Sequence, residues 1–508
     1  MELITTQRLS RYARIGLWGV GFLFLAAMIA VCVARMSYPY ELELMEGDIL
    51  LNVGRILQGK SLYAAPSLDS ASPVYTPFYF YLSALAAKLL GARLFSLRLV
   101  SFLSTLGCLG LVYRFVQRET RSPWFGALSA CLFAASFGAT GFWFDLARPD
   151  MLYILFCLAA GYCARFCPGI RGAALAGGFF SFALLTKQTA LLIVIPMILY
   201  FALVGRRELA VFAATFVVLS AAFLGYFQHA SSGWCYFYSF GAVSTVLTAK
   251  SMIILFWVRQ ILPQFGMSAL LSLFYVLNRW YSSDRRALIF YLPWFCGMAG
   301  ASWAYSLNWG AYLNGLLPIA ALLSILAGLG AHAALESFEI LQGRQRTMVE
   351  MCLTACLLIQ FGCLAFNPMD QIPGRADVEA GNRLAARLGQ IPGRIFICHH
   401  ATLYTAAGKE PSTPLIILGT LFASPNAEVA NGLRQELREA LRSQKFRAVV
   451  VDSDWFREYL PDDFRRDLNA TYGLRETISY PDTAVFRERT GLFIRPQFIY
   501  LPKSDASP

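Results

Sequence analysis

Apolar runs long enough to cross a lipid bilayer recur along the first 369 residues, and they constrain the fold more than any other feature. The first run covers residues 15–34. A helix needs about 20 mostly apolar residues to span the hydrocarbon core of a membrane. Hydrophobic residues make up 57% of the chain and charged residues 15%, against about 25% charged residues in soluble domains. The sequence therefore predicts a polytopic membrane protein.

Basic residues occur in small groups between the apolar runs, so the net charge of +12 does not indicate nucleic-acid binding. The groups are Arg8/Arg11/Arg14, Arg114/Arg118/Arg121, Arg165/Arg171, Arg206/Arg207, Arg279/Arg285/Arg286 and Arg344/Arg346. Because basic loops favour the cytoplasmic side of a membrane, we expect all of these groups to lie there. Two membrane passes must then separate each group from the next.

Eleven membrane-spanning helices follow from this pattern. We predict them at residues 15–34, 99–117, 123–144, 149–166, 172–187, 189–205, 209–228, 261–278, 287–306, 313–335 and 347–366. The N-terminus is then cytoplasmic, while loops at residues 35–98 and 229–260 and the C-terminal segment are exoplasmic. Residues 75–90 are also apolar, but Pro77 and the neighbouring aromatic residues favour a helix lying at the membrane interface.

After residue 369 the composition changes, and residues 370–508 predict a small soluble α/β domain on the exoplasmic side. Its amphipathic helices are predicted at residues 377–388 and 428–443, and its buried strands at residues 393–398 and 447–452. The predicted fold class is therefore mainly α. It consists of a polytopic domain over residues 1–369 followed by the small α/β domain.

Four acidic residues stand close together just after the first predicted helix: Glu41, Glu43, Glu46 and Asp48. A carboxylate held at the membrane surface can act as a general base toward a hydroxyl group. The simpler interpretation is a solvated acidic turn. Both interpretations remain open on composition alone.

Charged residues also lie at other predicted exoplasmic helix ends. Asp145, Arg148 and Asp150 precede or begin the predicted helix 149–166. They are candidates for binding a substrate. Alternatively, Asp150 caps the helix, and Asp145 and Arg148 extend toward the membrane surface.

Lys187 interrupts an apolar stretch at an exoplasmic helix end, against the usual charge bias. An ammonium group in this position can meet a lipid phosphate. Arg98, at the start of the second predicted helix, and Lys250 and Arg259 in the later loop are candidates of the same type. The alternative for each is a side chain that only extends to the interface.

Polar residues near 310 form a further candidate patch. Asn308, Tyr312 and Asn314 can hydrogen-bond a sugar, or they can cap helices. His399 and His400 follow a predicted strand, and we expect them in a turn or at the surface. The twelve cysteines and four histidines show no metal-ligand spacing, so no metal site is predicted.

Short motifs in the first 190 residues stand in a characteristic order. Glu46-Gly47 is followed by Arg55-Ile56-Leu57-Gln58-Gly59, and Tyr75-Thr76-Pro77-Phe78 leads through Gly91 to Arg98-Leu99. Asp150 and Lys187 come next. This arrangement resembles the bacterial family 39 glycosyltransferases of the GT-C superfamily, which include the aminoarabinose transferase for lipid A and relatives of the protein O-mannosyltransferases. The family has an Asp-Glu pair where this chain has Glu46-Gly47, so the base stays open between Glu46 and Asp48.

The resemblance implies inverting transfer of a sugar from a polyprenyl-phosphate donor to a hydroxyl acceptor on a lipid, glycan or protein. Glu46, Asp48 and Asp150 are then the catalytic candidates, and Arg98, Lys187, Lys250 and Arg259 the candidates for the donor phosphate. Candidates for contacts to the sugar or acceptor are Arg55, Tyr75, Asp145, Arg148, Asn308, Tyr312 and Asn314. No nucleotide or redox cofactor is expected, although Glu46 or Asp48 with phosphate leaves room for a divalent cation. The resemblance also implies the bacterial inner membrane, with the C-terminal domain in the periplasm.

Two other classes of protein fit part of this pattern. A transporter or lipid flippase also has many helices and buried charges, but it predicts charges near the bilayer midplane and often internal repeats. The candidate residues here gather at one surface, and the sequence shows no repeat. A membrane scaffold with an exoplasmic binding domain is the other alternative, and it predicts that the acids of the first loop are dispensable. For an enzyme, we expect the C-terminal domain to select or position the acceptor.

Overall fold

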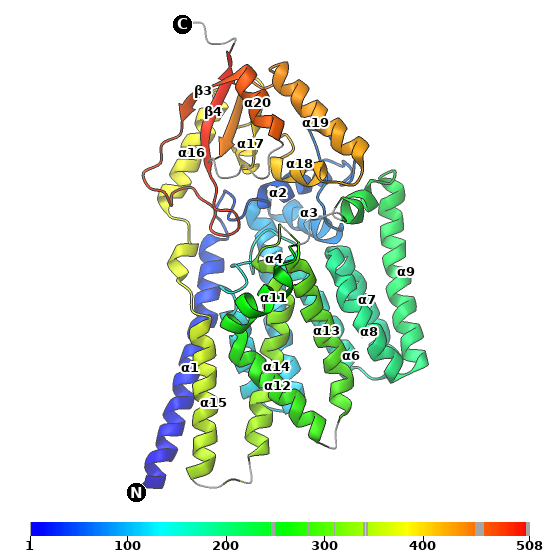
Figure 1. Ribbon diagram of the computed structural model, residues 1–508, viewed down its shortest axis with the longest axis vertical. Coiled ribbons are helices and arrows are strands. Elements are labelled where there is room, and N and C mark those ends of the chain that lie inside the picture. The colour runs from blue at the N-terminus through cyan, green and yellow to red at the C-terminus, as the bar shows by residue number, and fades with distance from the viewer. Residues whose placement is uncertain are drawn as a thin grey trace.

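A bundle of long helices carries a small sheet region at one end, in the computed structural model of the chain (Figure 1). The structure describes residues 2–242, 244, 249–282, 285–308, 310–338, 341, 344–452 and 462–503. The bundle helices are α1 (Glu2–Arg35), α4 (Leu94–Thr120), α5 (Pro123–Ala135), α6 (Asp150–Phe166), α7 (Gly169–Thr186), α8 (Leu191–Val204), α9 (Arg206–Ala230), α12 (Leu262–Tyr281), α13 (Arg286–Ser306), α14 (Leu317–Ser337) and α15 (Arg344–Cys363). We call the end of the bundle nearest the sheet its sheet end.

Each of the eleven predicted membrane segments contains one of these helices. Eight helical segments in the described part of the chain are long and apolar enough to cross a membrane. The other three predicted segments contain α5, α6 and α8, whose lengths are 13, 17 and 14 residues. The predicted span 123–144 is too long, because α5 stops at Ala135 and the chain then turns through Gly141, whose φ is 73°.

Helix α14 forms the centre of the bundle, since almost all of its residues are buried. Two glycines let neighbouring helices approach it closely. A Cβ on Gly328 would lie 1.9 Å from Ser129 of α5, and one on Gly330 would lie 2.0 Å from the Leu271 carbonyl of α12. Small residues at such crossings are typical of membrane helix packing.

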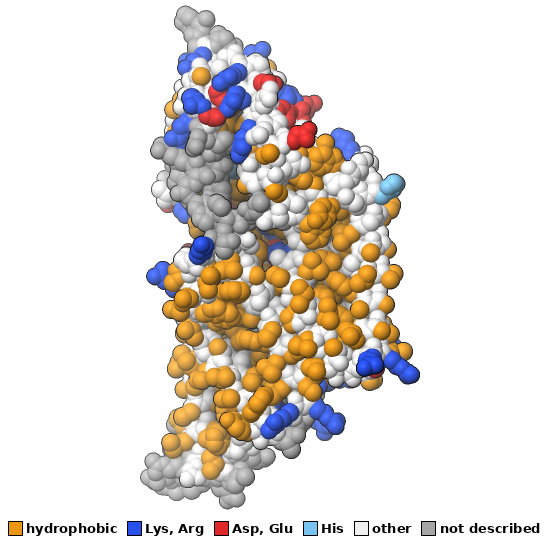
Figure 2. All heavy atoms as spheres, turned by 45° about the vertical axis from the view of Figure 1, so that its right-hand side comes forward, with side chains coloured by type: hydrophobic (Ala, Val, Ile, Leu, Met, Phe, Trp, Pro, Cys, Tyr) orange, Lys and Arg blue, Asp and Glu red, His pale blue; other side chains and the backbone are white. Residues whose placement is uncertain are grey.

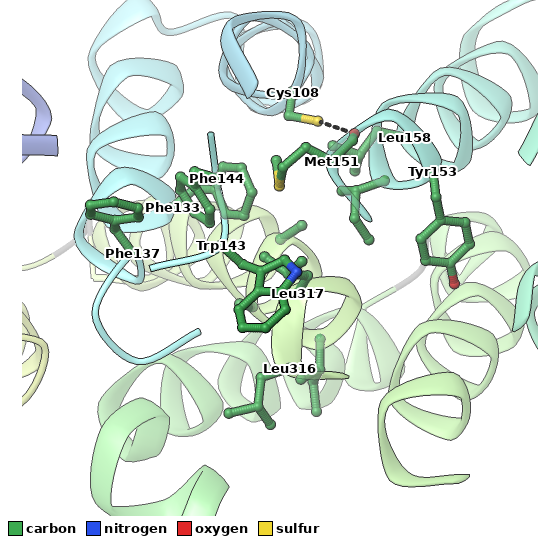
Figure 3. Packing of buried hydrophobic residues seen from close by; sticks show 14 of the residues in the cluster. Cys108, Phe133, Phe137, Trp143, Phe144, Met151, Tyr153, Leu158, Leu316 and Leu317 are labelled. Atoms are coloured by element: carbon green, nitrogen blue, oxygen red, sulfur yellow. Dashed lines mark hydrogen bonds between the residues drawn. The ribbon is translucent and has the colours of Figure 1, made fainter. Parts of the chain in front are cut away.

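The turn between α5 and α6 is packed as tightly as the helices. Figure 3 shows Trp143 of this turn lying over Leu317 of α14, with Phe133, Phe137 and Phe144 beside it. Trp143, Phe144 and Leu146 are buried. This packing fixes the turn at the sheet end, directly before Asp150 begins α6.

Two short helices lie between the bundle and the sheet region, α2 (Glu46–Leu57) and α3 (Phe78–Leu90) (Figure 1). Pro77 immediately precedes α3, and Gly91, with a φ of 94°, follows it. The predicted apolar helix at residues 75–90 is therefore present. It is a short helix outside the main spans, as its aromatic and proline content suggested.

The C-terminal sheet has four strands in the order β1-β2-β4-β3. They are β1 (Ile395–Ile397), β2 (Ala448–Asp452), β3 (Tyr472–Thr477) and β4 (Pro496–Pro502). β1 and β2 are parallel, and the other two pairs are antiparallel. Helices α16 (Arg375–Gly389), α17 (Thr402–Ala406), α18 (Leu415–Phe422), α19 (Ala427–Arg442) and α20 (Asp462–Thr471) accompany the sheet.

The surface agrees with a membrane protein. Figure 2 shows hydrophobic side chains over the flank of the bundle, while charged side chains gather on the sheet region and at the opposite end. An apolar face of this size needs a lipid or protein partner. The predicted fold class, a mainly α polytopic protein with a small C-terminal α/β region, is confirmed.

Candidate functional site

Most of the predicted site residues meet at the sheet end of the bundle. The residues come from α2, the start of α4, the turn before α6 and the junction between α7 and α8. Nearly all of them are buried, and they pair with one another. Buried ion pairs are costly to assemble unless each charge is fully compensated, so the details of the pairing show which groups are free to react.

Glu46 and Arg98 form a pair in which both groups are fully occupied. Glu46 Oε1 accepts from Arg98 Nε at 2.9 Å and from the Ala147 backbone at 2.7 Å, while Oε2 accepts from Arg98 Nη2 at 2.5 Å and from the Leu42 backbone at 2.8 Å. The remaining Arg98 donors reach the carbonyls of Arg35, Tyr38 and Tyr40. Burial opposes the charge of Glu46, but Arg98 outweighs burial and lowers its pKa.

This pairing disfavours the roles that the sequence motifs assigned to the two residues. Glu46 has no lone pair left to take a proton, and Arg98 has no N–H left for a phosphate. The structure also shows why a glycine at position 47 fits the site. A Cβ on Gly47 would lie 2.2 Å from Glu41 Oε1 and 3.0 Å from the Thr402 backbone nitrogen, so a larger residue at this position would have to displace the Glu41 side chain.

Asp145 is held in the same way. Its carboxylate accepts from Arg35 Nε at 2.8 Å and also from Nη2, and Arg35 Nη2 donates in addition to the Phe142 carbonyl. Both side chains are completely buried. The geometry thus places Asp145 in a support for the turn before α6 and leaves it no free side toward a sugar.

Arg148 stands at the centre of the site. Its Nη1 donates to Glu43 Oε2 at 3.0 Å and its Nη2 donates to the Tyr75 hydroxyl at 2.6 Å, while Nε is buried without a hydrogen-bond partner. Nε lies 4.0 Å from Asp150 Oδ2. Burial raises the pKa of Glu43 to about 7, although Arg148 lowers it.

Asp150 and Lys187 form the next layer toward the membrane. Asp150 Oδ1 accepts from Lys187 Nζ at 2.6 Å and from Asn314 Nδ2 at 3.0 Å, and Oδ2 accepts from Trp143 Nε1 at 3.0 Å. Lys187 Nζ also lies 4.8 Å from the ring centre of Tyr305. These groups line a hollow of about 240 Å³ that also contacts Thr189 and Leu317. Asn314 Oδ1 is buried there without a partner.

Among the described residues, Asp48 has no ion-pair partner of its own in the site. It is 3% exposed, and its Oδ2 has no hydrogen-bond partner. Burial raises its pKa to about 7, although Arg148 and Arg55 lower it. A carboxylate with this pKa and a free oxygen is suited to general-base chemistry near neutral pH.

The other predicted residues stand apart from this cluster. Lys250 and Arg259 are exposed, and Asn308 donates to the Tyr305 carbonyl three residues earlier, as a helix-end residue does. Tyr312 packs against Trp143 and accepts a hydrogen bond from Thr490. Arg55 lies beside Asp48 and donates to the Ser61 carbonyl.

Three residues of the site were missed from the sequence: Arg35, Trp143 and Tyr305. Arg35 ends the first apolar run, a position where basic residues are common. Trp143 and Tyr305 lie in apolar runs whose aromatic residues are expected to pack in the protein core. The roles of these three residues become clear only from their buried partners in the structure, which are Asp145, Asp150 and Lys187. In the sequence, the one signal that could have pointed to these three residues was the acidic residue near each helix junction.

His399 and His400 lie in the bend between β1 and α17, but the surface alternative predicted for them is wrong, because both are buried, with 2% and 4% of their surface exposed. His400 Nε2 lies 2.9 Å from Asp452 Oδ1, and its Nδ1 lies 3.6 Å from Glu488 Oε1. The next residues pack onto the first loop, where the Thr402 backbone donates to Glu41 at 2.7 Å. The histidines are thus covered by contacts between the sheet region and that loop.

The charges around His400 predict a loss of stability in alkali. Burial lowers the pKa of His400, but Asp452 and Glu488 outweigh it and raise the pKa to about 9. Its stabilising charge is therefore complete below the unfolded value of about 6.5 and disappears as the pH rises through 9. Burial raises the pKa of Glu488 to about 8, which acts in the same direction, whereas burial lowers that of His399 to about 4 and affects only acidic pH.

We expect the melting temperature of the purified protein to fall between pH 6.5 and pH 9.5, by the equivalent of about 1–3 kcal/mol. A double variant, His400→Gln with Glu488→Gln, should have a flatter profile over the same range. Thermal unfolding followed by tryptophan fluorescence in detergent measures both. Parallel profiles for the two proteins would contradict a role of this cluster in the pH dependence.

No three His, Cys, Asp or Glu side chains are arranged to hold a metal ion within the described ranges. The acids near the site are instead occupied by basic side chains, as in the Asp150–Lys187 and Glu43–Arg148 pairs. Asp48 Oδ2 is buried without a hydrogen-bond partner.

Comparisons with known proteins agree with this architecture. Residues 73–230 match the sequence model of a family described as dolichyl-phosphate-mannose-protein mannosyltransferase. This segment contains α3 to α9, and with them Arg98, Arg148, Asp150 and Lys187. No curated protein sequence matches the chain.

Solved structures share the fold over nearly the whole chain. ArnT from Cupriavidus metallidurans in the apo state has a TM-score of 0.58 at 13% identity, covering 96% of this chain and 98% of that one. The same protein bound to undecaprenyl phosphate has a TM-score of 0.57 at 14% identity, covering 96% and 99%. The archaeal oligosaccharyltransferase AglB from Archaeoglobus fulgidus has a TM-score of 0.53 at 11% identity, covering 89% and 73%. The resemblance predicted from the motifs is thus confirmed at the level of the fold, since the chain shares the fold of ArnT over nearly its whole length.

Proposed function

We propose that this chain is a membrane glycosyltransferase that moves a sugar from a polyprenyl-phosphate donor to a hydroxyl acceptor. The observation that carries the proposal is Asp48, a buried carboxylate with one unpaired oxygen and a pKa near 7. Arg148 links it to the pair of Asp150 and Lys187, since Arg148 acts electrostatically on Asp48 and lies 4.0 Å from Asp150. A free base beside a cluster of cations suits transfer from a phosphate leaving group.

In the proposed reaction, Asp48 Oδ2 takes the proton of the acceptor hydroxyl. The hydroxyl oxygen attacks the anomeric carbon, and the bond from that carbon to the lipid phosphate oxygen breaks. The phosphate leaves with the bonding electrons. Because the hydroxyl oxygen attacks from the face opposite to the phosphate, the configuration at the anomeric carbon inverts. Because the donor already carries an activated sugar, the reaction needs neither a nucleotide nor a redox cofactor.

Lys187 and Arg148 are the proposed partners of the donor phosphate. Both cations are buried, and fixed cations in a site of low polarity stabilise charge that develops on a leaving group. Asp150 keeps Lys187 in position and is itself occupied by three donors, so we assign it positioning rather than proton transfer. The relative that was solved with undecaprenyl phosphate supports a polyprenyl phosphate as the ligand.

The proposed location is the exoplasmic face of the bacterial inner membrane, with the N-terminus in the cytoplasm. Support comes from the basic groups, which stand at the end of the bundle away from the site, as at Arg206 and Arg207. The positive-inside rule places that end in the cytoplasm. The site and the sheet region then face the periplasm.

Transfer of radiolabelled sugar in membranes tests the proposal, with a panel of polyprenyl-phosphate sugars as donors. We expect donor-dependent transfer by the wild type. We expect Lys187→Met to lower kcat/KM for the donor about 10²–10³-fold, because a cation at the leaving group is lost. Lys88→Met, an exposed lysine on α3, is the matched control and should keep wild-type activity.

Donor binding is read from the same samples. Binding with movement of the lipid across the membrane, but without transfer, would favour the flippase alternative. Absence of both binding and transfer across a broad donor panel would exclude the glycosyltransferase.

A further inference from the structure

A second hollow is lined by Asp48 and is separate from the hollow around Lys187. It has a volume of about 310 Å³ and lies between α2, residues 69–71 and residues 411–414 of the sheet region. None of the residues around Lys187 lines it. The proposed base therefore stands at a pocket of its own.

Five buried polar atoms of residues that line this pocket have no hydrogen-bond partner. They are Asp48 Oδ2, Asn52 Oδ1, Arg55 Nε, Ser70 Oγ and Ser412 Oγ. Asp48 and Asn52 are 3% and 2% exposed. Buried polar groups in proteins are almost always hydrogen-bonded, so a concentration of unpaired ones at one pocket points to a polar ligand.

The chemistry of these atoms defines the ligand class. Asp48 and Asn52 offer acceptors, Arg55 offers a donor, and the Ser70 hydroxyl is both. A ligand with several hydroxyl groups satisfies such a mixture, because every hydroxyl donates and accepts. An alkyl chain would leave all five atoms unpaired, and the two lining acids, Asp48 and Asp69, disfavour an anion.

The sheet region forms one wall of this pocket, and hydrogen bonds to the first loop hold the wall in place. Thr413 donates its backbone N–H to the Leu68 carbonyl at 2.7 Å and its hydroxyl to the Ser67 carbonyl at 2.8 Å. Arg394 Nη2 lies 2.7 Å from Asp69 Oδ1. Ser412, which is 1% exposed, thus lines the pocket from a fixed backbone.

We propose that this pocket binds a sugar residue of the acceptor and presents one of its hydroxyl groups to Asp48. The inference rests on the proposed function and narrows its acceptor from any hydroxyl compound to a glycan. The C-terminal region then selects the acceptor through residues 411–414. Lipid and protein hydroxyls remain as outcomes of the test.

The test uses the full-length protein in nanodiscs. Methyl glycosides of glucose, galactose, mannose, arabinose and N-acetylglucosamine are the probes, and N-acetylserine amide and glycerol serve as non-sugar hydroxyls. Saturation-transfer NMR measures binding without any donor. The matched variants are Ser70→Leu, which fills the pocket without touching Asp48, and Thr483→Leu, an exposed position of the sheet region.

We expect at least one methyl glycoside to bind to the wild type and to Thr483→Leu, and to lose binding at least tenfold in Ser70→Leu. In the transfer assay, Ser70→Leu should raise KM for the acceptor at least tenfold and leave KM for the donor unchanged. A melting temperature equal to that of the wild type shows that the variant folds.

Failure of the acceptor-site inference and failure of the proposed function give different results. Sugar binding that Ser70→Leu abolishes, in a protein that transfers nothing from any donor, would keep the sugar pocket and overturn its role as an acceptor site. Donor-dependent transfer to the serine amide, or equal binding of every glycoside to both variants, would overturn the inference and leave the proposed function intact.

Discussion

Asp48→Asn is expected to lower kcat for sugar transfer about 10²–10⁴-fold, the usual contribution of a general base. The substitution keeps the size of the side chain and removes the unpaired oxygen that can take a proton. Donor binding should stay within a few-fold of the wild type, because the cations around the donor hollow are untouched. Initial rates of transfer at saturating donor, with donor binding measured on the same membranes, check both statements.

The pH dependence adds an independent measurement. Burial raises the pKa of Asp48 to about 7, and only the deprotonated carboxylate can act as a base. The wild-type rate should therefore fall as the pH drops through 7 and reach a plateau above pH 8. Residual activity of Asp48→Asn should lack this step.

Glu43 is the necessary control, since burial raises its pKa to about 7 as well. Its Oε2 accepts from Arg148 at 3.0 Å and from the Met45 backbone at 3.2 Å, so this cation holds the Glu43 carboxylate directly, whereas Asp48 has no such ion pair within the described part of the chain. Glu43→Gln should reduce the rate less than Asp48→Asn. A larger loss in Glu43→Gln would move the base to Glu43.

The arrangement of the helices was predictable because it follows from two local properties, apolar length and loop charge. These properties locate all eleven bundle helices and the short helix α3. They fail where tertiary packing decides the boundary. Residues 136–144 are as apolar as a helix needs, yet Gly141 adopts a φ of 73° and the chain turns so that Trp143 can reach Asp150.

The candidate site was predictable as a set of residues, but its division of roles was not. The motifs bring Glu46, Asp48, Arg98, Asp150 and Lys187 into one region, as the structure shows. Whether an acid is free or engaged depends on partners far away in sequence, such as the 52 residues between Glu46 and Arg98. No spacing rule in the sequence reports which carboxylate keeps an unpaired oxygen.

Arg98→Met is expected to destabilise the protein severely and to lower the yield of folded protein. The change leaves the buried Glu46 charge without its cation and leaves three backbone carbonyls without their donor. Breaking a buried ion pair by removing one partner costs about 3–5 kcal/mol. Thermal unfolding in detergent measures the loss as a lower melting temperature, and Arg114→Met, at an exposed arginine in the C-terminal half of α4, is the matched control.

A double variant separates this structural role from phosphate binding. If Arg98 serves chiefly to neutralise Glu46, then Glu46→Leu with Arg98→Met removes both charges and should recover part of the melting temperature lost in Arg98→Met. Replacing a whole buried pair with apolar residues is often neutral, whereas orphaning one charge is not. A phosphate ligand predicts the opposite pattern: a nearly unchanged melting temperature for Arg98→Met together with a large loss of donor binding. Because all five N–H groups of Arg98 already have partners, we expect the first pattern.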